Sequence, residues 1–222
     1  MPRPADEPAQ AVKVTLTFDN GPTPGVTEDV LDVLERYGVR STFFVIGQKL
    51  REHRALSQRA SEAGHWVGNH TMTHSVQLAD TDDPLAPEHE IGAAQAELGA
   101  LAHPARLFRP YGRGGILDRR LISHAGLDYL RQHSYTCVLW NCVPHDWDDP
   151  GGWVERALAD VAGRDWSLVV IHDLPTGAMD LLPRFLDGLD DLGAELVQEF
   201  PPECTPVERG RLVRPLAHLM PA

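Results

Sequence analysis

Apolar and polar positions along the chain change their period repeatedly, and each change predicts a strand or a helix. Val12–Asp19 alternates apolar and polar side chains, which is typical of a strand. Thr27–Tyr37 then places apolar residues three and four positions apart, on one face of a helix that Gly38 is expected to end. Ser41–Ile46 is a β-branched and aromatic run, which is typical of a buried strand. The chain therefore begins with a predicted strand–helix–strand unit.

The same alternation continues to the carboxyl end of the chain. Further strands are predicted at Trp66–Val67, Leu107–Arg109, Tyr135–Trp140, Leu168–His172 and Glu195–Phe200. Further helices are predicted at Arg51–Ala63, Glu88–Leu101, Asp118–His124, Gly152–Val161 and Leu181–Leu192. Repeated strand–helix units with apolar strands indicate an α/β fold, in which helices wrap a parallel sheet. With about seven strands in place of eight, we expect a small or distorted version of the eight-unit barrel.

Chain length and composition bound the domain organisation. The 222 residues suffice for one domain with a full-size core and are too few for two. We expect a flexible N-terminal segment at residues 1–11, a barrel domain at 12–200 and a proline-containing C-terminal arm at 201–222. The N-terminus lacks the apolar run of a signal peptide, and no stretch approaches the length of a transmembrane helix. We therefore expect a cytoplasmic protein without membrane association.

Charge and cysteine content exclude some classes of partner and of stabilisation. The chain has 20 Lys and Arg against 32 Asp and Glu, a formal net charge of -12. Such a surface repels phosphate backbones, so nucleic acid is not an expected partner, whereas neutral sugars and small amides are compatible with it. Cys137 and Cys142 should point to opposite faces of a strand, and with Cys204 they make an odd count. We therefore expect these three thiols to be buried and inert. The sequence does not indicate the oligomeric state.

Polar side chains that can carry chemistry follow the predicted strands. Asp19 ends the first strand, and Arg109, Asp146 and His172 lie at or just beyond later strand ends. In barrels of this kind the active site lies at the C-terminal ends of the strands. We therefore expect these side chains to meet at one rim. Taken singly, each has a structural alternative, such as a turn at Asp19, a salt bridge at Arg109 or a helix cap at Asp146.

Two histidines stand four residues apart in the stretch 69–74. On a helical turn, His70 and His74 would share a face, and their nitrogens could converge on one metal ion. The alternative is a pair of ordinary surface or core histidines, and the spacing alone does not decide between these readings.

Five stretches, taken in chain order, resemble the motifs of the polysaccharide deacetylases, also called carbohydrate esterase family four. They are TFDNGP at 17–22, NHTMTH at 69–74, FRPYG at 108–112, HDW at 145–147 and VVIHD at 169–173. The resemblance spans residues 14 to 173 and implies a distorted (β/α)7 barrel. It also implies metal-dependent hydrolysis that removes acetyl groups from N-acetylated or O-acetylated sugars or polysaccharides.

The resemblance implies a role for each matching residue. Asp19 would be the catalytic base, held by Arg109, and His172 would be the general acid, oriented by Asp146. The Tyr111 backbone N–H would help to form an oxyanion hole. The implied metal ligands are His70, His74 and Asn20, with zinc as the default ion and cobalt or nickel as alternatives. The implied substrate-binding residues are Trp147, Tyr111 and Ile171.

Three positions depart from the family's pattern. Asn20 stands where the family has a metal-binding aspartate, the arginine motif is one residue short, and Val143 stands where an aspartate is expected before Asp146. Asn20 can offer its carbonyl oxygen but no charge, so a catalytically inactive ligand-binding barrel is one alternative. A cytosolic amidohydrolase acting on a small cyclic amide or ureide is another, since related barrels host that chemistry. Because the whole proton-transfer set is present, we favour an active enzyme.

Overall fold

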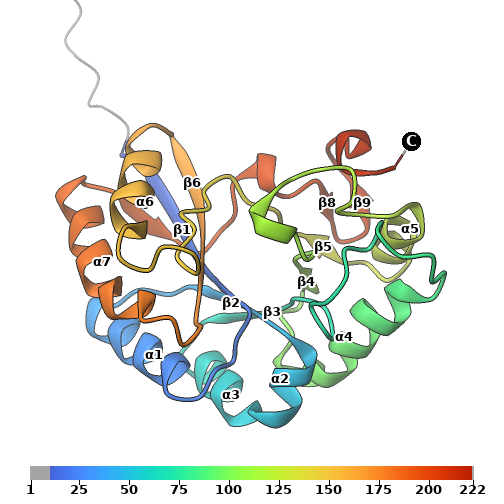
Figure 1. Cartoon of the computed structure of the whole chain (residues 1–222), viewed down its shortest axis with the longest axis horizontal. Helices are drawn as coiled ribbons and strands as arrows, with labels where there is room; N and C mark the ends of the chain where they lie inside the picture. Colours follow the sequence, from blue (N-terminus) through green and yellow to red (C-terminus); the bar gives the residue numbers. More distant parts are fainter. Residues whose placement is uncertain (1–10, 222) are drawn as a thin grey trace, which may run out of the picture.

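A curved, mostly parallel sheet passes through the middle of the molecule. The computed structural model describes residues 11–221 (Figure 1), so residues 1–10 of the predicted N-terminal segment lie outside the described range. The parallel strands are β1 Lys13–Asp19, β2 Thr42–Val45, β3 Trp66–Asn69, β4 Leu107–Phe108, β5 Thr136–Cys137, β6 Trp166–His172 and β7 Glu195–Val197. A hairpin of β8 Val207–Glu208 and β9 Arg211–Leu212 extends the sheet, whose order is β6-β1-β2-β3-β4-β5-β8-β9, with β7 paired to β1.

The parallel strands close on themselves through a short contact after β5. Strand β1 pairs with β6 along its whole length, while β2 and β7 share its other edge. Beyond β5, the N–H of Cys142 donates to the carbonyl of Leu168 over 3.2 Å, and the N–H of Val170 donates to the carbonyl of Cys142 over 3.0 Å. This bridge joins the two ends of the strand series, so the predicted distorted barrel is confirmed.

Seven α-helices in the described residues lie outside the sheet (Figure 1). They are α1 Val26–Tyr37, α2 Gly47–Glu52, α3 Arg54–Glu62, α4 Ala93–Leu98, α5 His124–Gln132, α6 Trp153–Ala162 and α7 Leu182–Asp191. Among residues 11–221, none of the helices has both the length and the apolar character needed to cross a membrane.

Two predicted helices differ from the observed ones. The helix expected to begin at residue 51 begins at Gly47 and is interrupted at His53, which separates α2 from α3. The helix expected near residues 118–124 is wrong, because that stretch forms turns and α5 begins only at its end. The Ser123 hydroxyl caps α5 by accepting the N–H of Gly126 over 2.9 Å, and Asp118 instead holds Arg120 in a turn.

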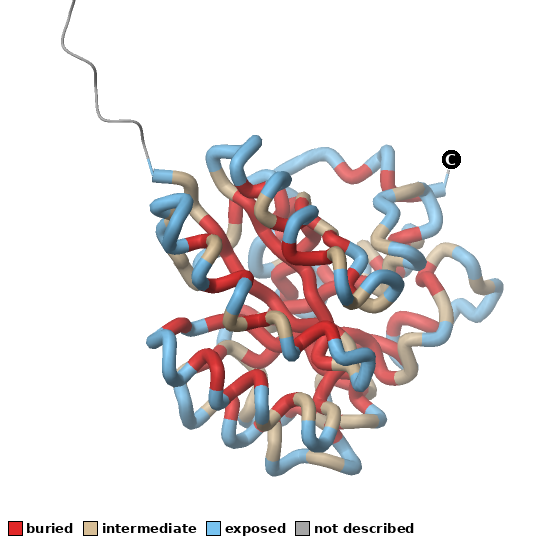
Figure 2. The backbone as a smooth tube through the Cα atoms, turned by 60° about the vertical axis from the view of Figure 1, so that its left-hand side comes forward, coloured by how far each residue is buried: buried red, intermediate tan, exposed pale blue. Residues whose placement is uncertain are grey.

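The core has two parts because successive strand residues point to opposite faces. In β6, Val169 and Ile171 pack outward against α1, α6 and α7, whereas Leu168 and Val170 belong to the cluster that includes Phe108. Figure 2 shows that burial follows the strands through the middle of the molecule. Cys142 lies in the first cluster and Cys137 in the second, and all three thiols are buried and free, as predicted.

The chain after residue 200 is part of the barrel domain and not a separate arm. Strand β8 pairs antiparallel with β5, and the N–H of Leu139 donates to the carbonyl of Cys204 over 2.7 Å. The buried side chains of this segment that join the second core cluster are Cys204, Val207, Leu216, Leu219 and Met220. The segment predicted as an arm therefore packs on the barrel through β8 and these core residues. Prolines made the segment resemble an arm, but its spaced apolar residues complete the core.

Candidate active site

The polar residues at the strand ends meet around one cavity. Asp19 and His172 are adjacent in the β1–β6 register, and His70 and Arg109 directly follow β3 and β4. A cavity of about 240 Å³ opens at this rim. The predicted site residues that line it are Asp19, Asn20, His70, His74, Tyr111, Trp147 and His172. The prediction that these residues share one rim is therefore consistent with the geometry, because parallel strands bring their carboxyl ends to the same edge.

Arg109 lies behind the cavity and holds Asp19. Its guanidinium is fully buried and donates to the Asp19 carboxylate over 2.7 Å and to the Thr17 hydroxyl over 2.8 Å. It also donates to the carbonyls of Val138 and Leu139, and it lies 4.0 Å above the Phe44 ring. Burial lowers the pKa of Arg109, and the charge and hydrogen bond of Asp19 oppose that effect. One Asp19 oxygen is thereby fixed, and the other is left for the cavity.

His70 presents an unprotonated nitrogen to that second oxygen. Its Nδ1 lies 2.8 Å from the carbonyl oxygen of Arg109, which can only accept, so Nδ1 carries the proton. Burial lowers the pKa of His70 to about 3, so the ring is neutral and its Nε2 has a free lone pair. This Nε2 lies 3.5 Å from Asp19 Oδ2. Two hydrogen-bond acceptors therefore face each other across the rim, an arrangement that favours a cation between or beside them.

His74 and Asn20 supply two more donor atoms near His70. The rings of His70 and His74 are 4.6 Å apart, on an irregular loop in place of the helical turn considered from the sequence. Burial and the neighbouring His70 lower the pKa of His74 to about 3. The Asn20 Oδ1 atom is buried and has no hydrogen-bond partner in the described part of the chain. Two neutral imidazoles and an unpartnered amide oxygen fit a divalent cation.

Of the four side-chain types that most often bind metals, His, Cys, Asp and Glu, this donor set contains only histidine, at His70 and His74. Among residues 11–221, no group of three or more His, Cys, Asp and Glu side chains is arranged to hold a metal ion. A cation at this rim would therefore depend on the side-chain oxygen of Asn20, or on water, for its further ligands. Because the Asn20 amide is uncharged and the two imidazoles are neutral, this donor set brings no negative charge to a cation.

His172 and Asp146 form a second polar pair at the cavity. His172 Nδ1 lies 2.8 Å from one Asp146 oxygen, and the backbone N–H of His172 donates to the other over 2.9 Å. Burial alone would lower the pKa of His172, but the hydrogen bond and charge of Asp146, together with the charges of Asp19 and Asp173, outweigh burial and raise it. Because Asp146 occupies Nδ1, the Nε2–H is the proton available to the cavity. The pair is suited to donate a proton.

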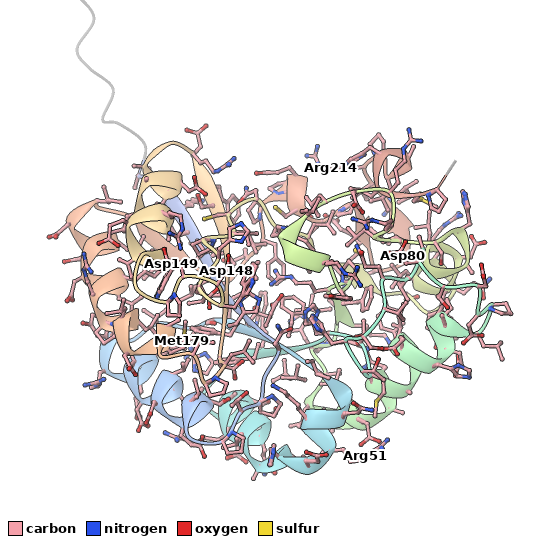
Figure 3. The ribbon with its side chains drawn as sticks, viewed as in Figure 1. Arg51, Asp80, Asp148, Asp149, Met179 and Arg214 are labelled. Carbon is pink, nitrogen blue, oxygen red and sulfur yellow. The ribbon has the colours of Figure 1, made fainter. Side chains whose placement is uncertain are left out.

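The alternative of a helix cap does not apply to Asp146, and the carboxylate nearest the beginning of α6 is that of Asp149. Asp148 and Asp149, labelled in Figure 3, lie in the loop before α6. The Asp149 carboxylate accepts the N–H of Gly152 over 3.1 Å and pairs with Arg156 over 2.7 Å. Asp149 therefore holds the turn that precedes α6, whose N-cap residue Gly152 has no side-chain cap, and Asp146 is left to His172.

The walls of the cavity agree only in part with the predicted substrate-binding residues. Trp147 and Tyr111 line it, and the Trp147 ring stands edge-on to His172 at 4.8 Å. Ile171 does not: it is fully buried in the outer core, because its neighbour His172 takes the inward direction in the strand. Val170 lines the cavity in its place, a position that the period of two along the strand could have indicated. Residues not predicted from the sequence complete the apolar side, namely Trp140, Val143, Leu174 and Gly112, Gly114 and Gly115.

The loop that carries Asn20 is held by residues without a predicted role. Lys49, half-buried in α2, donates to the backbone carbonyl of Asn20 over 2.8 Å. The buried Asp173 carboxylate lies so close to Gly21 that a side chain there would collide with it, and burial raises the pKa of Asp173 to about 7. Asp173 also accepts a hydrogen bond from Thr27. The sequence signal for Asp173 was its place after His172; Lys49 had none.

The chain is similar in sequence and in structure to several known proteins. A model of the family described as polysaccharide deacetylase matches residues 6–138. The chain is 36% identical to a chitooligosaccharide deacetylase of Rhizobium leguminosarum bv. trifolii, over 72% of this chain and 71% of the relative. It is 32% identical to a peptidoglycan-N-acetylglucosamine deacetylase of Bacillus cereus, over 72% of each. The structure of a family 4 carbohydrate esterase from Streptomyces lividans in complex with acetate superposes with a TM-score of 0.71 and 26% identity, covering 93% of this chain and 100% of that chain. The chain therefore belongs to the polysaccharide deacetylase family.

Proposed function

We propose that this protein is a metal-dependent deacetylase that removes the acetyl group from an N-acetylated sugar. Its relatives act, by name, on chitooligosaccharide and on the N-acetylglucosamine of peptidoglycan, which supports hydrolysis of a carbon–nitrogen bond in a sugar. The observation that carries the proposal is the arrangement of the cavity. The Asp19 carboxylate, the neutral His70 and the Asp146-paired His172 face the same space of about 240 Å³.

The metal part of the proposal rests on three donor atoms. His70, His74 and the Asn20 carbonyl oxygen are the residues that would hold a divalent cation, with zinc as the default and cobalt or nickel as alternatives. Such an ion, when bound, supplies Lewis-acid chemistry that makes a water more acidic and polarises a carbonyl group. The Arg109 carbonyl orients His70 so that Nε2 is free for this purpose.

The remaining chemistry belongs to the chain's own groups. Asp19, held by Arg109, accepts a proton from the attacking water. The Tyr111 backbone N–H donates to the oxygen that becomes negative as the acetyl carbon turns tetrahedral. His172 gives its Nε2 proton to the leaving nitrogen, and Asp146 keeps that imidazole charged and oriented. An amine leaves poorly without this proton, so the His172–Asp146 pair is essential to the proposal.

A direct assay separates this proposal from its rivals. We would purify the protein with zinc and measure acetate release from N-acetylated chitooligosaccharides and from acetylated xylan, and ring opening of cyclic amides and ureides. The proposal expects acetate release from the N-acetylated sugars, lost when the metal is chelated and restored when zinc is returned. Turnover of only the cyclic substrates would favour the amidohydrolase. A protein inactive with zinc, cobalt and nickel would favour the ligand-binding barrel that Asn20 suggests.

Asn20→Asp is expected to tighten zinc binding by about tenfold or more, because it adds a negative charge to a neutral ligand set. The affinity can be measured by competition with a chromophoric chelator. Gln48→Glu makes the same change of charge on the exposed surface of α2 and should leave the affinity nearly unchanged. Equal zinc affinity in the wild-type protein and in Asn20→Asp would mean that residue 20 is not a ligand.

Asp146→Asn is expected to move the alkaline decline of kcat/KM to lower pH by about one unit. His172 can donate a proton only while it is protonated, so activity falls as pH rises through its pKa. The Asp146 charge raises that pKa, and its removal lowers it. The measurement is a pH profile of kcat/KM, with the exposed Asp148→Asn as the control variant. An alkaline limb that stays in place in Asp146→Asn would remove His172 from the role of acid.

A further inference from the structure

The loop that joins His70 to His74 has an unusual backbone. Thr71 and His74 have φ angles of 67° and 54°, in the left-handed region that residues other than glycine rarely adopt. These two turns bring the imidazoles to the same side, with their ring centroids 4.6 Å apart. A loop with two such residues keeps its shape only when its surroundings hold it. The position of His74 therefore depends on the groups that hold residues 71–73.

One side of the loop is held by the beginning of α2. The N–H of Gly47 donates to the carbonyl of Thr71 over 2.9 Å, and the N–H of Gln48 donates to the carbonyl of Met72 over 3.0 Å. The first N–H groups of a helix have no partner within the helix, so they are available to the loop. These contacts satisfy the loop's carbonyl groups and leave its N–H groups to the other side.

The other side is held by a single carboxylate, that of Glu90. One Glu90 oxygen accepts the backbone N–H groups of Met72 and Thr73 over 3.0 and 2.9 Å, and the other accepts the Thr73 hydroxyl over 2.6 Å. The side chain is buried, with 7% of its surface exposed. Within the described range, no Lys or Arg side chain forms an ion pair with it. All three hydrogen bonds that stabilise this buried charge thus come from one loop.

The backbone around Glu90 reinforces the same loop. Glu90 lies in a π-helical turn, Glu88–Gly92, that precedes α4. The carbonyl of Ile91 in this turn accepts a hydrogen bond from the Asn69 side-chain NH₂ over 2.9 Å, and the Asn69 side-chain oxygen Oδ1 accepts the N–H of Thr71 over 2.9 Å. Single π-turns inside helices occur frequently at functional sites. This turn therefore contacts both the beginning and the middle of the loop between the histidines.

We propose that Glu90 is a positioning residue of the metal centre, which holds the 71–74 loop so that His74 faces His70. The inference rests on the proposed function, because it assumes that the two imidazoles bind a cation. Without the Glu90 carboxylate, two buried backbone N–H groups and one hydroxyl lose their acceptor. The left-handed conformations of Thr71 and His74 then lose the contacts that stabilise them. As a result, the His74 imidazole is no longer held beside that of His70 before the metal binds.

Zinc affinity tests the inference in three variants. Glu90→Ala is expected to weaken zinc binding by about 10- to 100-fold, as loss of a group that orients a metal ligand typically does. Glu90→Gln keeps one carbonyl oxygen for the two N–H groups and should restore part of the affinity. Glu88→Ala removes an exposed carboxylate from the same π-turn and should bind zinc as the wild-type protein does. Wild-type affinity in both Glu90 variants would overturn the inference.

Amide hydrogen exchange in the metal-free proteins gives a second readout that needs no metal and no activity. Glu90→Ala should exchange faster at residues 71–74, while the strands and Glu88→Ala exchange as in the wild-type protein. If Glu90→Ala does not fold, zinc affinity and hydrogen exchange are measured on Glu90→Gln, in which smaller changes in the same direction are expected. A wild-type protein that binds no zinc would refute the metal centre, and with it this role of Glu90, even where exchange shows that Glu90 holds the loop. Zinc binding with unchanged exchange and affinity in the variants would refute Glu90 alone.

Discussion

Asp19→Asn is expected to lower kcat by about 10²- to 10⁴-fold while zinc affinity stays close to that of the wild-type protein. The substituted amide has the same shape, and its oxygen can still accept the Arg109 N–H that holds the side chain in place. It cannot take a proton from water, because an amide is not a base at neutral pH. None of the three proposed metal donors is removed by the change. Steady-state acetate release and chelator competition on the same preparation measure the two quantities.

The control for Asp19→Asn must separate loss of a base from loss of folding. Asp118→Asn removes one negative charge from an exposed ion pair with Arg120 and should leave kcat unchanged. Urea unfolding of both variants establishes that each is folded under the assay conditions. A folded Asp19→Asn protein that keeps more than about a tenth of the wild-type kcat would assign the base to another group.

The rim of the barrel could be predicted from the sequence because its cause is regular. Every strand of a parallel sheet ends at the same edge, so residues that follow strands, such as Asp19 and His172, meet whatever the lengths of the loops between them. The same regularity was available for the walls of the cavity. Alternation along β6 places Val170 beside His172 on the inner face and sends Ile171 outward, so the strand period indicates Val170 as the wall residue.

The contacts that could not be predicted from the sequence are made by segments with irregular backbone. Glu90 contacts a 71–74 loop in which Thr71 and His74 adopt left-handed conformations, and no periodicity indicates such a loop. The core residues of the carboxyl-terminal segment could not be identified from the sequence for a related reason. Its apolar residues are spaced by turns, so neither a helical nor a strand period identified Val207 and Leu219 as core. Such loops determine which distant residues a single side chain contacts, and these contacts are known only from the three-dimensional structure.

Arg109→Met is expected to lower the free energy of unfolding by about 3–5 kcal/mol and to abolish turnover. The substitution keeps most of the volume of a fully buried side chain but removes the cation beside Asp19. It also removes the donors to the Thr17 hydroxyl and to the Val138 and Leu139 carbonyls. An unpaired carboxylate in that position is costly, and a carboxylate without its partner is no longer oriented toward the cavity. Urea unfolding at constant pH measures the stability change.

The double variant Asp19→Asn with Arg109→Met decides how much of that loss comes from the unpaired charge. If the isolated carboxylate is the main cost, replacing it by an amide recovers stability, so the double variant should be more stable than Arg109→Met alone. The cycle should therefore be strongly non-additive, by about 1–3 kcal/mol. Arg120→Met, which removes the cation of an exposed pair, should change stability little. Additive losses in the cycle would mean that Arg109 stabilises the barrel through packing and carbonyl contacts, and that Asp19 keeps its orientation without it.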